Sequence, residues 1–168
     1  YNAIKAKVVN QLDKYDMLII SGGISVGDYD FVKTIMADIG VETVFYKVKQ
    51  RPGKPLFAGI KNGKWIFALP GNPASVITCF NQYVKPCLNA MMGNQSCFEP
   101  DLILPLFNEW TKKVPLTHFH KEKKENGKVK ILAGQESFNL LPFNETDCFV
   151  QMDADINYLA AGTMVEVY

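Results

Sequence analysis

Residues 16–23 read Asp16-Met17-Leu18-Ile19-Ile20-Ser21-Gly22-Gly23, a continuous apolar run that ends at two glycines. Such a run predicts a strand that is buried on both faces. Helical spacing of apolar residues flanks the run on both sides, over residues 3–14 and residues 30–40. Gly40 stands where a glycine commonly ends a helix. The pattern therefore predicts a helix, a buried strand and a second helix.

The alternation of helix and strand continues toward residue 92. Residues 41–48 are rich in β-branched and aromatic side chains and predict a second strand. Residues 56–60 and 65–69 flank Asn62-Gly63, the strongest short signal for a hairpin. A third helix is expected after Pro73, with an apolar face formed by Val76, Phe80 and Val84. Together these elements predict an α/β layer with a largely parallel sheet.

The pattern of apolar residues changes after Gly93, and helical spacing is no longer seen. Prolines punctuate short apolar segments, and a second Asn-Gly pair separates residues 116–124 from residues 128–132 as a hairpin. Further short β segments are expected around residues 140–141, 148–150 and 164–167. We therefore predict two domains: residues 1–95 form an α/β domain, and residues 96–168 form a small all-β, barrel-like domain.

Composition excludes several classes of protein. The 168 residues carry 18 Lys and Arg against 17 Asp and Glu, a balance that argues against a partner such as nucleic acid or a membrane surface. No apolar run approaches the roughly 20 residues that span a bilayer. The four cysteines lack the C-x-x-C spacing of a zinc site. Reduced thiols and the lack of a leader predict the cytoplasm, although a chain that starts at Tyr1 is expected to be a fragment.

Three loops could hold an anion, because ligands of α/β sheets bind beyond the carboxyl ends of the strands. In loop 1, residues 21–30, glycines would let backbone N–H groups approach a ligand and serines would add hydroxyl groups. Asp28 and Asp30 suit Mg²⁺, but an aspartate at the start of a helix is also an ordinary cap. The loop reads Ser21-Gly22-Gly23-Ile24-Ser25-Val26-Gly27-Asp28-Tyr29-Asp30.

Loops 2 and 3 have the same character. Loop 2, Pro52-Gly53-Lys54-Pro55, holds Lys54 in a stiff turn beside Arg51 and suits a phosphate or another oxyanion, although an exposed lysine is commonly just solvated. Loop 3, residues 69–75, leads into a helix whose first turn presents free N–H groups. Here Asn72 followed by Pro73 is also a complete helix cap.

Two patterns point elsewhere. Residues 23–27 match the nucleophile elbow G-x-S-x-G, so a serine hydrolase that uses Ser25 with Asp101 and His118 or His120 is a remote alternative. A short chain and the lack of an oxyanion loop of the HGGG type argue against it. Residues 112–130 are rich in lysine, but the Asn-Gly turn within them favours a solvated hairpin over a nucleic-acid surface, with both histidines at that surface.

The three loops, in this order and spacing, resemble those of the molybdopterin molybdenumtransferases, the MoeA-type proteins and the E domain of gephyrin and its plant counterparts. The resemblance covers essentially the whole chain. It implies that residues 1–95 are the C-terminal part of a three-layer α/β/α molybdopterin-binding domain and that the rest is the family's small β domain. The implied reaction inserts molybdate into adenylylated molybdopterin, with Mg²⁺-dependent release of AMP.

The resemblance also implies roles for single residues. Asp30, Ser25 and Lys54 would be catalytic, and Asp28 and Asp30 would hold Mg²⁺. The residues expected to bind the cofactor are Ser21, Gly22, Gly23, Gly27, Arg51, Pro52, Gly53, Gly71, Asn72, Ser75 and Ser137. Ser137 is included because Gln135-Glu136-Ser137 resembles the family's Q-x-S segment.

The chain departs from the family pattern in two places. Arg51 replaces the usual lysine before Pro-Gly-Lys, and arginines common near the start of the β domain are missing, which leaves Lys121 as a possible substitute. The family forms homodimers through regions that this chain lacks, so the fragment alone is expected to be inactive. A molybdopterin adenylyltransferase is a possible partner. A molybdopterin-binding or scaffold module without catalysis is the alternative.

Overall fold

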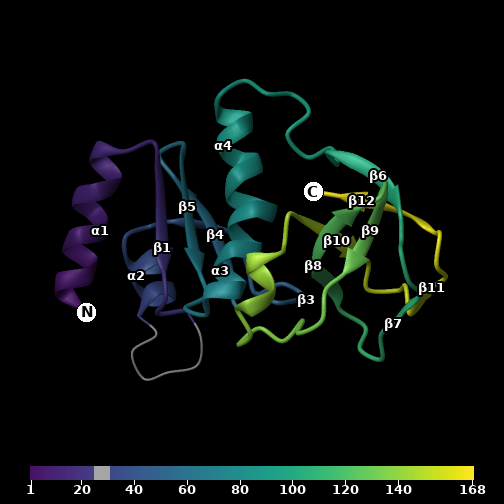
Figure 1. Cartoon of the computed structure of the whole chain (residues 1–168). Helices are drawn as coiled ribbons and strands as arrows, with labels where there is room; N and C mark the ends of the chain where they lie inside the picture. The colour runs from purple at the N-terminus through teal and green to yellow at the C-terminus, as the bar shows by residue number, and fades with distance from the viewer. Residues whose placement is uncertain (25–30) are drawn as a thin grey trace. The chain divides into compact units, whose positions relative to one another are not determined.

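The computed structural model describes residues 1–24 and 31–168, which fold as two compact units (Figure 1). The first unit consists of Tyr1–Val48 and Gly53–Val84, and the second of Lys49–Pro52 and Lys85–Tyr168. The functional boundary after residue 95 stays a prediction. In the part of the chain that the structure describes, no helix is long and apolar enough to cross a membrane.

The first unit contains a four-stranded sheet in the order β1-β5-β4-β2. Only β1 and β5 are parallel; β5 with β4 and β4 with β2 are antiparallel. The prediction of a largely parallel sheet is therefore wrong, because the tight Asn62-Gly63 turn sends β5 back along β4. The elements of the first unit are α1 (Asn2–Lys14), β1 (Met17–Ser21), α2 (Val32–Asp38), β2 (Glu42–Tyr46), β4 (Phe57–Lys61), β5 (Lys64–Leu69), α3 (Pro73–Cys79) and the π-helical turn η1 (Phe80–Val84).

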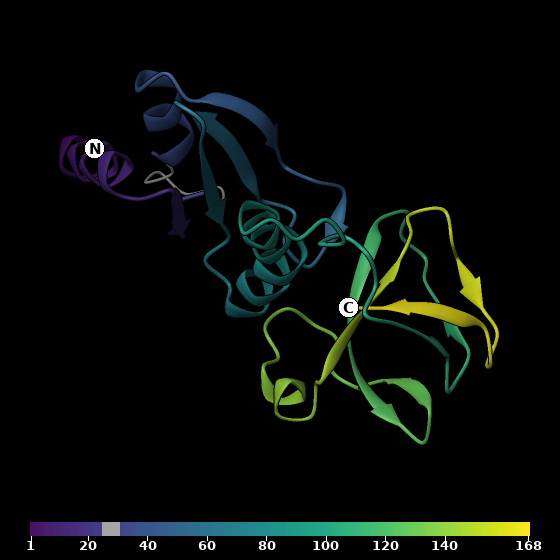
Figure 2. The same ribbon diagram turned by 90° about the horizontal axis from the view of Figure 1, so that it is seen from above.

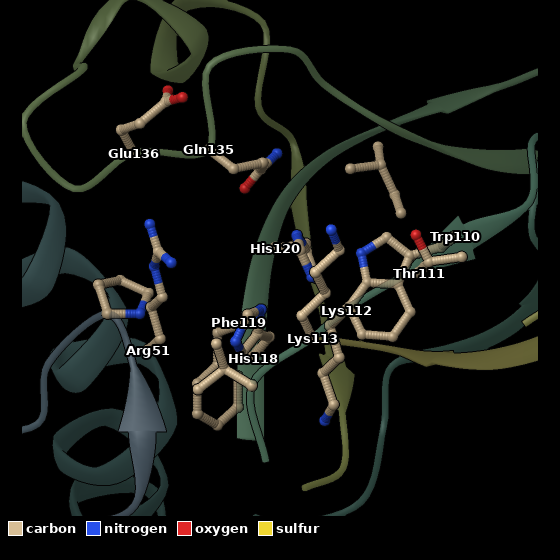
Figure 3. Close-up of a pocket in the computed structure, with 13 residues that line it drawn as sticks. Arg51, Trp110, Thr111, Lys112, Lys113, His118, Phe119, His120, Gln135 and Glu136 are labelled. Atoms are coloured by element: carbon tan, nitrogen blue, oxygen red, sulfur yellow. The ribbon is translucent and has the colours of Figure 1, made fainter. Parts of the chain in front are cut away.

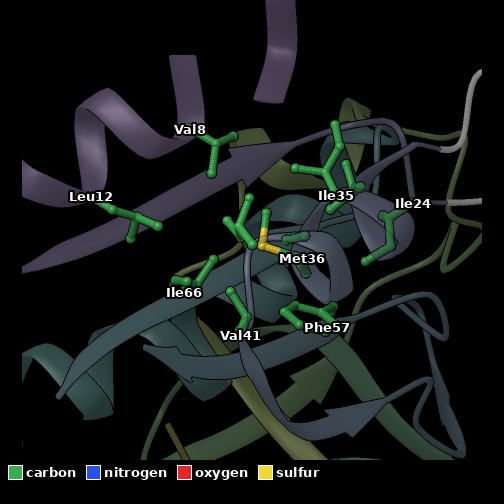
Figure 4. Close-up of a cluster of buried hydrophobic side chains, with 11 residues drawn as sticks. Val8, Leu12, Ile24, Ile35, Met36, Val41, Phe57 and Ile66 are labelled. Carbon is green, nitrogen blue, oxygen red and sulfur yellow. The ribbon is translucent and has the colours of Figure 1, made fainter. Parts of the chain in front are cut away.

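Helices cover both faces of this sheet. Figures 1 and 2 show α1 and α2 on one side and α3 on the other, which confirms the expected α/β/α layering. Figure 4 shows the core on the α1 and α2 side, where Val8 and Leu12 of α1 meet Ile35 and Met36 of α2 over Ile66 of β5. Burial of these apolar side chains is the main force that holds the layers together.

Three expectations about the first unit can be compared with the structure. Gly40 has φ +73° and ends α2, as predicted. The predicted double burial of β1 is wrong: Ile19 is 42% exposed because β1 is an edge strand that pairs only with β5 among the described residues. Val84 is buried as predicted, but Phe80 is 37% exposed, and the buried face of α3 runs instead through Ala74, Thr78 and Cys79.

The second unit is rich in strands, as predicted. Its main sheet has the order β3-β8-β10-β12-β6, with β9 paired to β8, and a separate ribbon joins β7 and β11. The core includes Leu106, Trp110 and Val150. The elements are β3 (Gln50–Arg51), α4 (Lys85–Met91), β6 (Leu102–Pro105), β7 (Trp110–Thr111), β8 (Thr117–Glu125), β9 (Lys128–Ile131), the 3₁₀-helix η2 (Leu141–Asn144), β10 (Cys148–Met152), β11 (Tyr158–Leu159) and β12 (Met164–Val167).

Two turns of this unit bear on the predictions. The β8–β9 hairpin forms around Asn126 and Gly127, which have φ +51° and +71°, and is thus confirmed. The β segment expected near residues 140–141 is wrong, because the chain enters η2 there. Pro142 lies in the first turn of η2, a position that suits a residue with a fixed φ and no N–H group.

Candidate functional site

Loops 1 and 3 meet at the carboxyl ends of the parallel strands β1 and β5. Ser21 is the register partner of Leu69, and the Gly22 N–H donates to the Leu69 carbonyl at 3.0 Å. A Cβ atom added to Gly71 would lie 3.7 Å from the Gly22 Cα. These contacts bring the start of loop 1 against loop 3, and the expectation that all three loops converge at one edge stays a prediction for loop 2.

Only the start of loop 1 belongs to the described residues. Gly22 and Gly23 have φ +83° and +68°, a conformation that glycine adopts without strain. Ser21 is exposed, whereas Ile24 is buried and anchors the loop in the core. The predicted catalytic and metal-binding residues Ser25, Gly27, Asp28 and Asp30 lie outside the described residues, as does the serine-hydrolase alternative that depends on Ser25.

Loop 3 caps α3 in the way that the sequence predicts. The Asn72 side chain accepts a hydrogen bond from the Ser75 N–H at 3.2 Å, and Pro73 occupies the first helical turn. One of the free N–H groups of this turn is thereby satisfied by the protein itself. The Ser75 side chain is buried, and Gly71 is exposed.

Loop 2 divides between the two units. In the first unit, the Lys54 carbonyl accepts from the Val48 N–H at 3.0 Å, and the Cys79 thiol of α3 lies 3.7 Å from the Gly53 carbonyl. Gly53 is buried and Lys54 is exposed. The loop backbone is thus fixed while the Lys54 side chain can reach a ligand. Arg51 and Pro52 belong to the second unit.

The second unit contains a cavity of about 450 Å³ (Figure 3). Sequence reasoning did not predict this cavity. Three cationic side chains, Arg51, Lys112 and Lys113, line it against one carboxylate, Glu136. Its other lining residues are Pro52, Trp110, Thr111, Val114, His118, Phe119, His120, Ile131 and Gln135. The excess of positive charge favours an anionic ligand over a metal cation.

Arg51 reaches this cavity through a short parallel pairing. In β3, Gln50 is the register partner of Thr117 and Arg51 that of His118. The Thr117 N–H donates to the Lys49 carbonyl at 3.0 Å. Sequence reasoning missed this pairing, because a strand of two residues is too short for an alternating pattern to be recognised.

Lys112 forms a fixed cation on the opposite wall. Its ammonium group donates to the Leu116 carbonyl at 2.8 Å and to the Asp153 carbonyl, and it lies 5.8 Å from the centroid of the Trp110 ring. Burial lowers the pKa of Lys112 from its ordinary value. Hydrogen bonds to two carbonyls nevertheless favour the charged form.

His118 and His120 lie between these walls in Figure 3, with ring centroids 5.5 Å apart. Within residues 1–24 and 31–168, His118 Nε2 and both ring nitrogens of His120 are buried without a hydrogen-bond partner. Burial, followed by the charge of His118, lowers the pKa of His120 to about 3. The nearby Gln135 side chain opposes this shift, but its amide group is already bonded to backbone groups.

The expected solvated hairpin is therefore wrong for part of β8. His120, Lys121 and Glu122 are buried, because β8 lies inside the sheet between β10 on one side and β3 and β9 on the other. The histidine predicted at the surface is instead part of a cavity wall. The run of five charged residues from Lys121 to Glu125 concealed this burial.

Lys121 fastens the loop that closes one side of the cavity. Its ammonium group donates to the carbonyls of Gly134 at 2.8 Å, Asn139 at 3.0 Å and Glu136 at 3.4 Å. The Gln135 amide also exchanges hydrogen bonds with the Lys121 backbone, at 3.0 and 2.8 Å. Lys121 thus holds the loop rather than presenting its charge to a ligand. Gln135 and Glu136 line the cavity, and Ser137 is half-buried outside its lining.

The family model for a probable molybdopterin binding domain matches residues 1–90 of the chain. The chain belongs to this molybdopterin-binding family. A molybdopterin molybdenumtransferase of Staphylococcus epidermidis is 30% identical over 164 residues, which are 95% of this chain and 39% of that relative. The corresponding protein of Staphylococcus aureus is 29% identical over the same shares. The chain therefore spans 39% of the length of these curated relatives.

Solved structures of proteins of molybdenum cofactor biosynthesis share the fold of this chain. A molybdopterin biosynthesis MoeA protein from Pyrococcus horikoshii matches with a TM-score of 0.74 and 27% identity, covering 98% of this chain and 39% of that chain. A molybdenum cofactor biosynthesis protein from Pyrococcus furiosus matches with a TM-score of 0.76, covering 99% of this chain and 54% of that chain. Its identity of 18% supports a shared fold alone.

Proposed function

We propose that this chain is part of an enzyme of molybdenum cofactor biosynthesis that inserts molybdate into adenylylated molybdopterin and releases AMP. The observation that carries the proposal is the meeting of loops 1 and 3 at the ends of two parallel strands, through the Gly22 N–H and the Leu69 carbonyl. This is the position where α/β sheets hold ligands. The membership of residues 1–90 in the molybdopterin-binding family supports it.

In this proposal the loops of the first unit bind the adenylylated cofactor. Ser21, Gly23, Gly27, Gly53, Gly71 and Asn72 would provide N–H and hydroxyl donors to its phosphate groups, and Ser75 would provide its hydroxyl group. Gly22, whose N–H is bonded to the Leu69 carbonyl, would let the backbone approach the cofactor closely. Lys54 would neutralise their charge, and its exposed side chain on a fixed backbone suits that role. Ser25 would donate a hydrogen bond rather than act as a nucleophile, because phosphoryl transfer depends on alignment and charge neutralisation.

The cavity of the second unit would bind molybdate. Arg51 and Lys112 line it with positive charge, which suits a small oxyanion. Ser137 is proposed as a more distant contact on the loop held by Lys121. Mg²⁺ would be held by Asp28 and Asp30, whose carboxylates are the ligands that this ion prefers, and would neutralise charge on the phosphate groups.

The remaining features of the proposal rest on the family resemblance. We propose that the enzyme acts in the cytoplasm as a homodimer and receives its adenylylated substrate from a molybdopterin adenylyltransferase. Nucleic acid and membranes are not among the proposed partners.

An anaerobic calorimetric titration of molybdopterin tests the cofactor site. We expect saturable binding that is weakened about 10- to 100-fold by Lys54→Ala, since hydrogen bonds to charged groups contribute about 1.5–3 kcal/mol. Ser75→Ala should weaken binding less. Lys7→Ala, a change of an exposed lysine on α1, is the matched control and should leave affinity unchanged. Equal affinity of the Lys54→Ala variant and the wild type would contradict the assigned site.

A further inference from the structure

His120 is a buried base without a partner in a cavity whose charge suits an anion. Its side chain is 6% exposed, and neither ring nitrogen has a hydrogen-bond partner among the described residues. Its ring centroid lies 5.1 Å from that of Trp110, and its register partner on β10 is the apolar Val150. Buried polar groups are normally hydrogen-bonded. The missing partners therefore point to a ligand in the cavity.

The groups that face His120 keep its ring neutral. Arg51 approaches from β3, Lys112 and Lys113 from the segment after β7, and His118 from β8 itself. The loop held by Lys121 contributes Gln135 and the single carboxylate, Glu136. A further positive charge beside these three cations is unfavourable, and burial adds to the cost of charging the ring.

A bound dianion would reverse this balance. Its two negative charges would offset the positive charges of Arg51 and Lys112. They would also attract a positive charge on the imidazole ring. A charged ring donates from both nitrogens, whereas a neutral ring has one donor and one acceptor. An oxyanion without hydrogen atoms can accept from both nitrogens but cannot donate to either.

We propose that His120 takes up one proton from the solvent when a dianionic oxyanion binds in this cavity, so that anion and proton bind together. The proton moves from water or buffer to the unprotonated ring nitrogen, and no covalent bond forms or breaks. This inference rests on the proposed function only in placing an oxyanion in the cavity. His120 is thus a binding residue that sequence reasoning had placed at the surface.

Calorimetric titration of the 168-residue chain with sodium molybdate and, separately, sodium sulfate tests the coupling. Titrations at equal pH in two amine buffers of different ionisation enthalpy give the number of protons taken up. We expect proton uptake that grows toward one proton per anion as pH falls from about 8 to about 5, with an affinity that rises by at most about tenfold for each unit fall in pH. Sulfate stays a dianion throughout this range, so proton uptake with sulfate must occur on the protein.

Two variants locate the proton. His120→Gln should still bind the anion but without proton uptake and with an affinity independent of pH, whereas His118→Gln should keep the uptake. The chain has two histidines, so the ring resonances in a ¹H–¹⁵N spectrum can be assigned from these variants, and the His120 signals should move to the positions of a charged ring on addition of sulfate. Thermal unfolding confirms that both variants fold.

The outcomes separate the inference from the proposed function. Anion binding without proton uptake, or uptake that survives in His120→Gln, would overturn the inference and leave the oxyanion site standing. A chain that binds neither molybdate nor sulfate at any pH would overturn both the oxyanion site and the coupling, while the molybdopterin titration would still report on the loops of the first unit.

Discussion

Arg51 and His118 are register partners on neighbouring parallel strands, although one precedes loop 2 and the other lies deep in the β-rich part of the sequence. The pairing brings a guanidinium group and an imidazole ring to one cavity. The backbone pairing with β8 holds the Arg51 backbone at the edge of the cavity, so only the side chain of Arg51 has to be ordered by a ligand.

Arg51 should dominate oxyanion binding. Arg51→Ala is expected to weaken the affinity for molybdate about 10- to 100-fold, because a charge-assisted, bidentate contact is lost. Arg51→Lys should restore part of the affinity, since charge is kept but the forked geometry is not. Lys49→Ala changes an exposed neighbour on the same segment and serves as the control in calorimetric titration. An equal loss in Lys49→Ala would indicate a general charge effect instead.

Glu122 should make the second unit less stable at high pH. Its side chain is fully buried, neither oxygen has a partner among the described residues, and burial raises its pKa from 4.5 to about 8. The folded state therefore holds its proton more tightly than the unfolded state. The stabilising effect is complete below pH 4.5 and is lost by at most about 1.4 kcal/mol per pH unit as pH rises toward 8.

Glu122→Gln replaces the neutral carboxyl with an amide that does not titrate. Urea unfolding at about pH 5, 7 and 9 should show the variant gaining stability over the wild type as pH rises, by a few kcal/mol at the highest pH. Glu125→Gln, a change of an exposed carboxylate on the same strand, should show no such trend. A pH-independent difference between Glu122→Gln and the wild type would refute the assignment of a buried neutral carboxyl.

Lys121 should control the order of the loop over residues 134–139. Lys121→Met keeps the apolar stem but removes the donor to three carbonyls, so we expect a loss of about 1–3 kcal/mol in the free energy of unfolding. Hydrogen exchange of the loop amides should accelerate more than that of the first unit. Lys124→Met, at an exposed position of β8, provides the matched comparison. Unchanged exchange in the loop would show that other contacts hold it.

Gly71 should matter for the ligand and little for the fold. An added Cβ atom would make only an ordinary contact with Gly22, at 3.7 Å, so Gly71→Ala should change stability by no more than about 0.5 kcal/mol. The methyl group would nevertheless stand between loops 1 and 3, and molybdopterin affinity should fall roughly tenfold. Gly59→Ala is the contrasting variant, because its Cβ would lie 2.6 Å from Val41 Cγ1 and 2.9 Å from the Glu42 carbonyl. It should destabilise the first unit by about 1–3 kcal/mol.

The features that could be predicted from sequence are those that a few neighbouring residues determine. Both Asn-Gly hairpins, the Asn72 cap and the helix end at Gly40 form as expected, because each depends on local backbone geometry. The meeting of loops 1 and 3 also followed from a general rule about strand ends. Roles assigned to single residues of loop 1 rest on the family resemblance and stay predictions.

The features that could not be predicted depend on contacts between distant segments. Burial of His120 and Glu122 results from the position of β8 within its sheet, and the charged residues around them suggested a solvated hairpin. The antiparallel pairing of β2 with β4 likewise depends on which strands become neighbours. In each case a correct local pattern was compatible with more than one tertiary arrangement.

Lys49–Pro52 belongs to the second unit although the chain on either side of it belongs to the first, which matters for any attempt to produce the units separately. A single cut after residue 95 would separate the β-rich region from a strand that its sheet requires. The isolated piece would expose the backbone edge of Thr117 and His118 to foreign strands and would lack the arginine of its own cavity. The second unit therefore cannot be isolated by one cut in the chain, because Lys49–Pro52 belongs to it but lies within the sequence of the first unit.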